Sequence, residues 1–137
     1  MTTRSKLLEE ETTGAIIGAF FDVHGTLGFG YRETIYAAAL DRELRARGHQ
    51  VDREVPVIVY YRGVPLAKQV FDMVVDKKVI VEIKATERLP SGTDRQIFSY
   101  LCSTTLEVGL ILHFGRRPGF HRVICENRLK QFSQSPK

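Results

Sequence analysis

Three charged residues stand inside two strand-like segments near the middle of the chain, and they limit what this sequence can fold into. The segments Val70–Val75 and Val79–Ala85 are rich in Val and Ile, and they contain Asp72, Glu82 and Lys84. Strands of this composition, flanked by helical sequence, normally lie in the middle of a sheet with both faces buried. A charge buried there is costly unless a partner compensates it. The two acids and the lysine therefore indicate a metal ion and a catalytic group.

The geometry of a hairpin decides whether the two acids can meet. Side chains alternate along a strand, so Glu82 and Lys84 share one face. The connection between the two segments is short and polar, which predicts a hairpin. A three-residue loop pairs Val75 with Val79 and puts Asp72 opposite Glu82, with Cβ atoms about 4.5–5.5 Å apart. A two-residue loop would send the acids to opposite faces. We expect the longer loop, and with it two carboxylates that can share one Mg²⁺.

A third acid lies on a predicted helix. The segment Tyr31–Arg47 follows a glycine-rich turn and has helical periodicity. Glu33 falls in the same stripe as Tyr36 and Leu40, on the face that should pack on the sheet. One interpretation is a carboxylate in the first helical turn that interacts with the helix dipole. The other is a third acid that reaches toward the pair on the strands.

The order of the remaining segments predicts a mixed α/β sheet with helices packed on its faces. We expect one domain over residues 1–125 and a polar tail, which frays, over residues 126–137. The other predicted elements are helices at about Lys6–Val23 and Thr93–Thr104, and strands at Val51–Tyr61 (as one or two pieces, kinked at Pro56), Val108–Phe114 and Phe120–Cys125.

Composition narrows the class of protein. The 137 residues are 43% hydrophobic and 26% charged, as in soluble globular proteins. No apolar run approaches the about 18 residues that span a membrane, and the N-terminus is too polar for a signal peptide. The only cysteines, Cys102 and Cys125, have no CxxC spacing, so we expect reduced thiols in a cytoplasmic protein. The formal charge of +4 mildly favours a polyanionic partner.

An ordered set of motifs links the chain to a known family. Residues 30–36 read GxxExxY, and the later motifs are Asp72, Glu82-Ile83-Lys84, Gln96 and Tyr100. In this order, and from about Glu11 to Val123, the chain resembles the GxxExxY family of the PD-(D/E)XK nuclease superfamily. An isolated Asp…Glu-x-Lys arises often by chance, whereas the ordered set is specific.

The resemblance implies a restriction-endonuclease-like core and assigns roles to particular residues. Asp72 and Glu82 would bind Mg²⁺ or Mn²⁺, with the backbone carbonyl of Ile83 and the carboxylate of Glu33 as further ligands. Lys84 would be the catalytic lysine. The chain departs from its relatives at His113, where they commonly have Asn before Phe-Gly. This position lies outside the catalytic set, so we treat the change as neutral.

The substrate side of the site is predicted on the helix after the strands. Gln96 and Tyr100 are four residues apart and share one helical face, where they could contact a phosphate. The alternative for Gln96 is a capping box with Thr93. Arg88 and Arg95 flank this helix and are the best candidates for phosphate contacts.

Two functions are consistent with these residues. The first is a metal-dependent nuclease that hydrolyses DNA or RNA. It would have no membrane partner, and it could form a homo-oligomer. The second is a non-catalytic module that binds nucleic acid or protein on the same fold. In that second case the acids and Lys84 would form a buried ion pair without chemistry.

Overall fold

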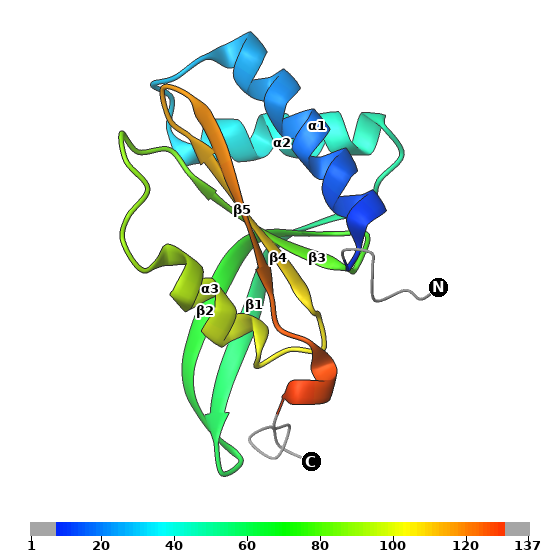
Figure 1. The fold of residues 1–137 in the computed structure, drawn as a ribbon, viewed down its shortest axis with the longest axis vertical. Helices are drawn as coiled ribbons and strands as arrows, with labels where there is room; N and C mark the ends of the chain where they lie inside the picture. The colour runs from blue at the N-terminus through cyan, green and yellow to red at the C-terminus, as the bar shows by residue number, and fades with distance from the viewer. Residues whose placement is uncertain (1–7, 131–137) are drawn as a thin grey trace.

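The computed structural model describes residues 8–130 (Figure 1). Two helices come first, then a strand pair and a third strand, then a helix and two more strands. The elements are α1 (Glu10–Leu27), α2 (Glu33–Ala46), β1 (Val51–Tyr61), β2 (Val64–Val75), β3 (Val79–Lys84), α3 (Thr93–Leu101), β4 (Val108–Phe114), β5 (Pro118–Ile124) and the 3-10 helix η2 (Asn127–Leu129).

The strands form one mixed sheet in the order β1-β2-β3-β4-β5. Strands β3 and β4 are parallel, and every other neighbouring pair is antiparallel. A parallel pair needs a crossover, and α3 supplies it. This is the α/β architecture that the order of the predicted segments indicated, with a restriction-endonuclease-like arrangement of sheet and helices.

The helices cover both faces of the sheet and create two apolar cores (Figure 1). Helices α1 and α2 pack on one face, against Val79, Val81 and Ile83 of β3. Helix α3 packs on the other face, where Ile80 of β3 meets Ile97. Because β3 is covered on both faces, it is rich in Val and Ile throughout, as a central strand should be.

The loop between β2 and β3 has the predicted length of three residues. Val75 pairs with Val79, and the antiparallel register continues to Met73 and Val81. Within the loop, Asp76 and Lys77 have φ angles of 56° and 55°, in the left-handed region. The register that the metal interpretation requires is therefore present.

Strand β2 leaves β3 at Asp72. The paired residues of the two strands end at Met73 and Val81, while β1 and β2 continue together as a hairpin that projects from the molecule (Figure 1). Phe71 and Val74 both contact the α3-side core, although simple alternation would put them on opposite faces. The strand is therefore twisted near Asp72, where its pairing with β3 ends.

Several element boundaries differ from the sequence-based expectation. Helix α1 continues past Gly25 and ends before Gly28, which has a φ of 72°. Its predicted start at Lys6 lies outside the described residues. Strand β1 is a single strand, with an irregularity between Val59 and Tyr60, and not at Pro56. Helix α3 ends at Leu101, three residues early.

The first part of the predicted tail is attached to the domain. The backbone N–H of Asn127 donates to Glu107 Oε2 at 2.8 Å, and Lys130 Nζ donates to the carbonyl of Thr104 at 2.8 Å. Residues 126–130 are therefore not frayed as expected, because they form hydrogen bonds with residues just before β4. Residues 131–137 of the predicted tail lie outside the described residues.

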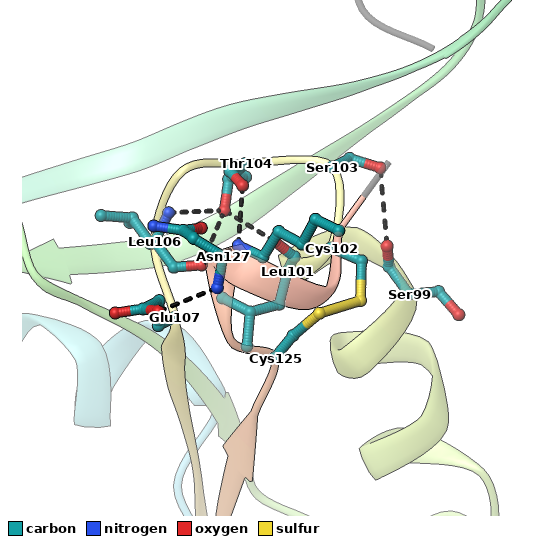
Figure 2. Close-up of a disulfide and its surroundings, with 10 residues drawn as sticks. Ser99, Leu101, Cys102, Ser103, Thr104, Leu106, Glu107, Cys125 and Asn127 are labelled. Atoms are coloured by element: carbon teal, nitrogen blue, oxygen red, sulfur yellow. Dashed lines mark hydrogen bonds between the residues drawn. A yellow bond between two sulfur atoms is a disulfide. The ribbon is translucent and has the colours of Figure 1, made fainter. Parts of the chain in front are cut away.

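The expectation of reduced thiols is wrong, because Cys102 and Cys125 form a disulfide (Figure 2). Cys102 follows α3 and Cys125 follows β5, and their Cα atoms are 5.8 Å apart, within bridging range. Spacing along the sequence could not reveal this proximity, because the sheet creates it. The expectation of a cytoplasmic protein loses the support it took from free thiols. Among residues 8–130, no helix is both long enough and apolar enough to span a membrane.

Candidate active site

The two strand acids meet where the pairing of β2 with β3 ends. One oxygen of Asp72, Oδ2, accepts a hydrogen bond from the backbone N–H of Ile83 at 2.6 Å. The backbone N–H of Asp72 lies 3.4 Å from Glu82 Oε1. These contacts replace the ladder hydrogen bonds that end at Met73, so each carboxylate is held by the backbone of the neighbouring strand.

Glu82 is buried, and its carboxyl group has a raised pKa. The residue is 9% exposed. Burial and, to a smaller extent, the negative charge of Asp72 together raise the pKa of its carboxyl group to about 7, while Lys84 opposes the shift. A carboxyl group whose charge is disfavoured by burial and by a second acid is a natural ligand for a cation, which would relieve both penalties.

Lys84 stands beside Glu82 on the same face of β3. Its Nζ is 3.7 Å from Glu82 Oε2, and its side chain is 25% exposed. The ammonium group can therefore interact with Glu82 and still reach a molecule that binds beside the end of β3. A lysine held this way can orient a water molecule or offset negative charge that develops on a substrate.

Glu33 reaches the end of β3 and not the other two acids. It is the first residue of α2, and its Oε2 accepts a hydrogen bond from the backbone N–H of Ala85 at 3.2 Å. Its place in the first helical turn agrees with the first interpretation from the sequence, and its carboxylate does not contact the pair on the strands. The acid lies in the first turn of the helix, and it also faces the sheet close to Lys84.

The donor set suits a divalent ion at two carboxylates. Oxygen atoms of Asp72 and Glu82 are the kind of ligand that Mg²⁺ and Mn²⁺ prefer. Within residues 8–130, however, no three Asp, Glu, His or Cys side chains lie close enough together to hold one ion. The three acids expected to converge are thus not gathered into one group, because Glu33 binds the N–H of Ala85. The N–H of Ile83 contacts Asp72, and a ligand role for its carbonyl remains a prediction.

Helix α3 packs Tyr100 against β2. Its ring packs edge-on against Phe71, the residue before Asp72, with 5.9 Å between ring centroids. Gln96, one turn earlier, is exposed. The capping alternative for Gln96 is wrong: within the described residues no side chain caps α3, its N-cap is Gly92, and Thr93 Oγ1 donates instead to the carbonyl of Pro90.

The two arginines predicted to contact phosphate lie in different surroundings. Arg88 is exposed in the loop between β3 and α3. Arg95 lines an open hollow of about 370 Å³ between α3 and β5, together with Phe98 and Arg122. Since Tyr100 packs toward β2 while Arg95 faces β5, the structure does not gather Arg95 with the residues on the opposite flank of α3.

His113 is a residue whose position the sequence reasoning undervalued. In the parallel register of β3 and β4 it is the direct neighbour of Lys84. Its Nε2 lies 2.7 Å from the carbonyl oxygen of Thr86, two residues after that lysine. Aligning the two predicted strands in parallel would have suggested the neighbourhood, but no pattern in the sequence predicts the hydrogen bond.

Comparisons with known proteins agree with the fold. A protein solved as SSO0001 is similar in structure, with a TM-score of 0.53 and 18% sequence identity over 68% of this chain and 50% of the other. At this identity the likeness concerns the fold, and the chain spans half the length of that protein. No curated protein matches the sequence. A family model described as PD-(D/E)XK nuclease superfamily matches residues 10–123, which include the strand acids, the lysine and α3. The chain therefore belongs to the PD-(D/E)XK nuclease superfamily.

Proposed function

We propose that this protein is a divalent-metal-dependent nuclease of the GxxExxY family, which hydrolyses phosphodiester bonds in DNA or RNA. The observation that carries the proposal is the position of Glu82. This carboxyl group is buried, has a pKa raised to about 7 by burial and by Asp72, and lies 3.7 Å from the amine of Lys84. In a member of a nuclease superfamily, such a cluster is best explained as a site for a cation and a phosphate.

Asp72 and Glu82 would hold Mg²⁺ or Mn²⁺, with the carbonyl of Ile83 and the carboxylate of Glu33 as further ligands. The ion would supply polarisation of the phosphate and a lower pKa for the attacking water. Glu33 would have to exchange its hydrogen bond to Ala85 for such a role.

The chain's own residues would orient the substrate. Lys84 is exposed enough to contact a phosphate oxygen and to offset the charge that develops there. Tyr100 and Gln96 lie on the flank of α3 that faces β2, where their phenol and amide groups could bind the adjoining phosphate. Arg88 and Arg95 would contact phosphates of the nucleic acid that lie farther from the scissile bond.

A cleavage assay with matched lysine variants tests this function. Wild type, Lys84→Met and Lys78→Met are incubated with single- and double-stranded DNA and RNA, in Mg²⁺, Mn²⁺ or EDTA. Lys78 is an exposed lysine of the β2–β3 loop and serves as the control. We expect cleavage by wild type and Lys78→Met, loss in Lys84→Met, and loss in EDTA. Failure of the wild type to cut any of these substrates would reject the proposal.

The second candidate is a binding module without catalysis. It is favoured by one observation: Asp72 accepts a hydrogen bond from the backbone of β3 and Glu33 accepts one from the residue directly after β3, so both carboxylates have partners without a cation. A module of this kind would bind DNA or RNA equally well in EDTA and after Asp72→Asn. Binding that needs the metal and the acid would argue against it.

A further inference from the structure

The end of β3 is fastened by side chains from three other elements. The N–H of Ile83 is bound by Asp72 of β2, and the N–H of Ala85 by Glu33 of α2. The carbonyl of Thr86 faces Nε2 of His113 of β4 at 2.7 Å. Lys84 is therefore flanked on both sides by backbone groups that side chains hold in place.

We propose that His113 is a positioning residue for Lys84. The inference rests on the nuclease function proposed above and adds a residue outside its catalytic set. A carbonyl oxygen only accepts hydrogen bonds, so Nε2 of His113 must carry the proton and donate it to Thr86. This bond fixes the first residues of the connection to α3, directly after the lysine.

The register places the imidazole of His113 on the same face of the sheet as Glu82 and Lys84. In the parallel pairing, Glu82 is the neighbour of Ile111, and Lys84 is the neighbour of His113. Ile111 packs in the α3-side core, so alternation puts His113 on the sheet face that carries Glu82 and Lys84. Neighbouring strands are about 4.8 Å apart, which makes His113 adjacent to the lysine.

A close contact fixes the ring in this position. A Cβ atom added at Gly115 would lie 2.9 Å from Cε1 of His113 and 3.1 Å from its Nε2. The backbone of Gly115 thus passes close to the imidazole, and any larger residue there would force the ring to shift from the position in which it binds Thr86. Gly115 gives a second, independent way to disturb the hydrogen bond.

We call the hydrogen bond between His113 and Thr86 the clamp. It matters because the end of β3 near Lys84 lacks a paired strand on one side. The ladder with β2 stops at Met73 and Val81, before Lys84 is reached. On that side Asp72 holds the strand through the N–H of Ile83, whereas β4 continues to His113 on the other. Without the bond to Thr86, the loop after Lys84 would gain freedom, and the amine would be misplaced relative to Glu82.

Two substitutions of similar size separate the hydrogen bond from packing. His113→Gln keeps an N–H donor at nearly the place of Nε2, whereas His113→Met fills the same space without a donor. His121, an exposed histidine on β5, provides the control pair His121→Gln and His121→Met. We measure thermal unfolding, hydrogen exchange of the amides in residues 85–92, and cleavage kinetics for each variant.

We expect His113→Met to lower kcat by about 10- to 100-fold, the range that follows from misplacing a catalytic group, with KM changed less than twofold. The amides of residues 85–92 should exchange faster, and His113→Gln should restore both measurements. Gly115→Ala should reproduce the effect of His113→Met, and the His121 variants should match the wild type. If His113→Met is unfolded, Gly115→Ala and His113→Gln decide the question.

The hydrogen-exchange measurement keeps this inference separate from the proposed function. If wild type cuts nothing, the nuclease proposal fails, yet faster exchange in His113→Met with recovery in His113→Gln would still support the clamp. Unchanged exchange in His113→Met and Gly115→Ala would overturn the clamp. A folded His113→Met that retains the kcat of an active wild type would also overturn it.

Discussion

The carboxylate of Asp72 accepts a hydrogen bond from the backbone N–H of Ile83 at 2.6 Å, just beyond the last paired residues of β2 and β3. A side chain thus continues the connection between two strands after their backbones separate. The hydrogen bond holds the end of β3 beside β2. The acids of the site therefore also connect β2 to β3 through hydrogen bonds.

This double role predicts different results for two substitutions of Asp72. Asp72→Asn keeps an oxygen that can accept the N–H of Ile83, so we expect a stability within about 1 kcal/mol of wild type. Asp72→Ala leaves that N–H without its acceptor and should lower the free energy of unfolding by about 1–3 kcal/mol. Both should lose metal-dependent cleavage. Urea unfolding measured beside the cleavage assay tests the two effects separately.

Asp52 offers a control for this comparison, because its carboxylate lies in an exposed ion pair with Lys77 at 3.6 Å. Such pairs contribute about 0–1 kcal/mol, so Asp52→Asn and Asp52→Ala should be nearly equal in stability. An Asp72→Asn variant as unstable as Asp72→Ala would contradict the supporting role of the hydrogen bond. Cleavage that survives in Asp72→Asn would contradict its role in metal binding.

The raised pKa of Glu82 predicts how stability depends on pH. The pKa rises from 4.5 to about 7 on folding because burial and the charge of Asp72 disfavour the ionised form. The folded state therefore binds this proton more tightly, and its contribution is complete below pH 4.5 and is lost as the pH rises through 7. At about 1.4 kcal/mol per pH unit, the loss at pH 8 is of the order of 3 kcal/mol.

A neutral isostere should escape this loss. We expect Glu82→Gln to melt several degrees above wild type at pH 8, and the difference to vanish near pH 4.5. Addition of Mg²⁺ at pH 8 should raise the melting temperature of wild type and not that of Glu82→Gln, because the ion would compensate the buried charge. Differential scanning calorimetry at the two pH values decides. A constant difference between the proteins at all pH values would disprove the assignment.

The sheet could be predicted from sequence because its central strands carry a strong local signal. The Val- and Ile-rich run of β3 and the polar three-residue loop before it predicted both the hairpin and the pairing of Val75 with Val79, which the structure confirms. The ends of α1 and α3 were less certain, because fraying and capping depend on packing around them. The link between Cys102 and Cys125 depends wholly on how α3 docks beside β5.

The residues of the site were predictable, but their contacts were not. Alternation and loop length bring Asp72 near Glu82, and the structure has that register. The twist of β2 at Asp72, however, is a tertiary effect, and it turns the carboxylate toward Ile83. For the same reason Glu33 was expected at the other acids and is found at Ala85. The pairing of His113 with Lys84 follows from a parallel register that only the crossover through α3 establishes.

The disulfide should stabilise the docking of α3 (Figure 2). It closes a loop between positions 23 residues apart, for which chain-entropy estimates give about 3 kcal/mol. We expect the double variant Cys102→Ser, Cys125→Ser to unfold at lower urea concentration than oxidised wild type. In dithiothreitol the two proteins should become nearly equal. Free thiols in air-oxidised, folded wild type, detected with a thiol reagent, would contradict the bridge.

The loop that sets the register of the acids is strained at Lys77, and a glycine there should relieve it. Lys77 has a φ of 55°, in a region that costs a residue with a side chain about 1–2 kcal/mol relative to the right-handed one. Glycine adopts this conformation freely, but it also loses more conformational freedom on folding. Lys77→Gly also removes the exposed ion pair with Asp52, which contributes about 0–1 kcal/mol. We therefore expect the substitution to raise the free energy of unfolding by up to about 1 kcal/mol, the net of these three effects.

The neighbouring Lys78 gives a matched control for Lys77→Gly, since both lysines are exposed in the same loop. Lys78 is not among the residues with a positive φ, and its N–H donates to the carbonyl of Val75 at 3.0 Å. Lys78→Gly should therefore lower stability by up to about 1 kcal/mol, because it adds freedom to the unfolded chain without relieving strain. Urea unfolding of both variants measures the difference. Equal changes in the free energy of unfolding would mean that the left-handed conformation of Lys77 is not strained. The alignment of Asp72 with Glu82 would then be determined by the sheet and not by the turn.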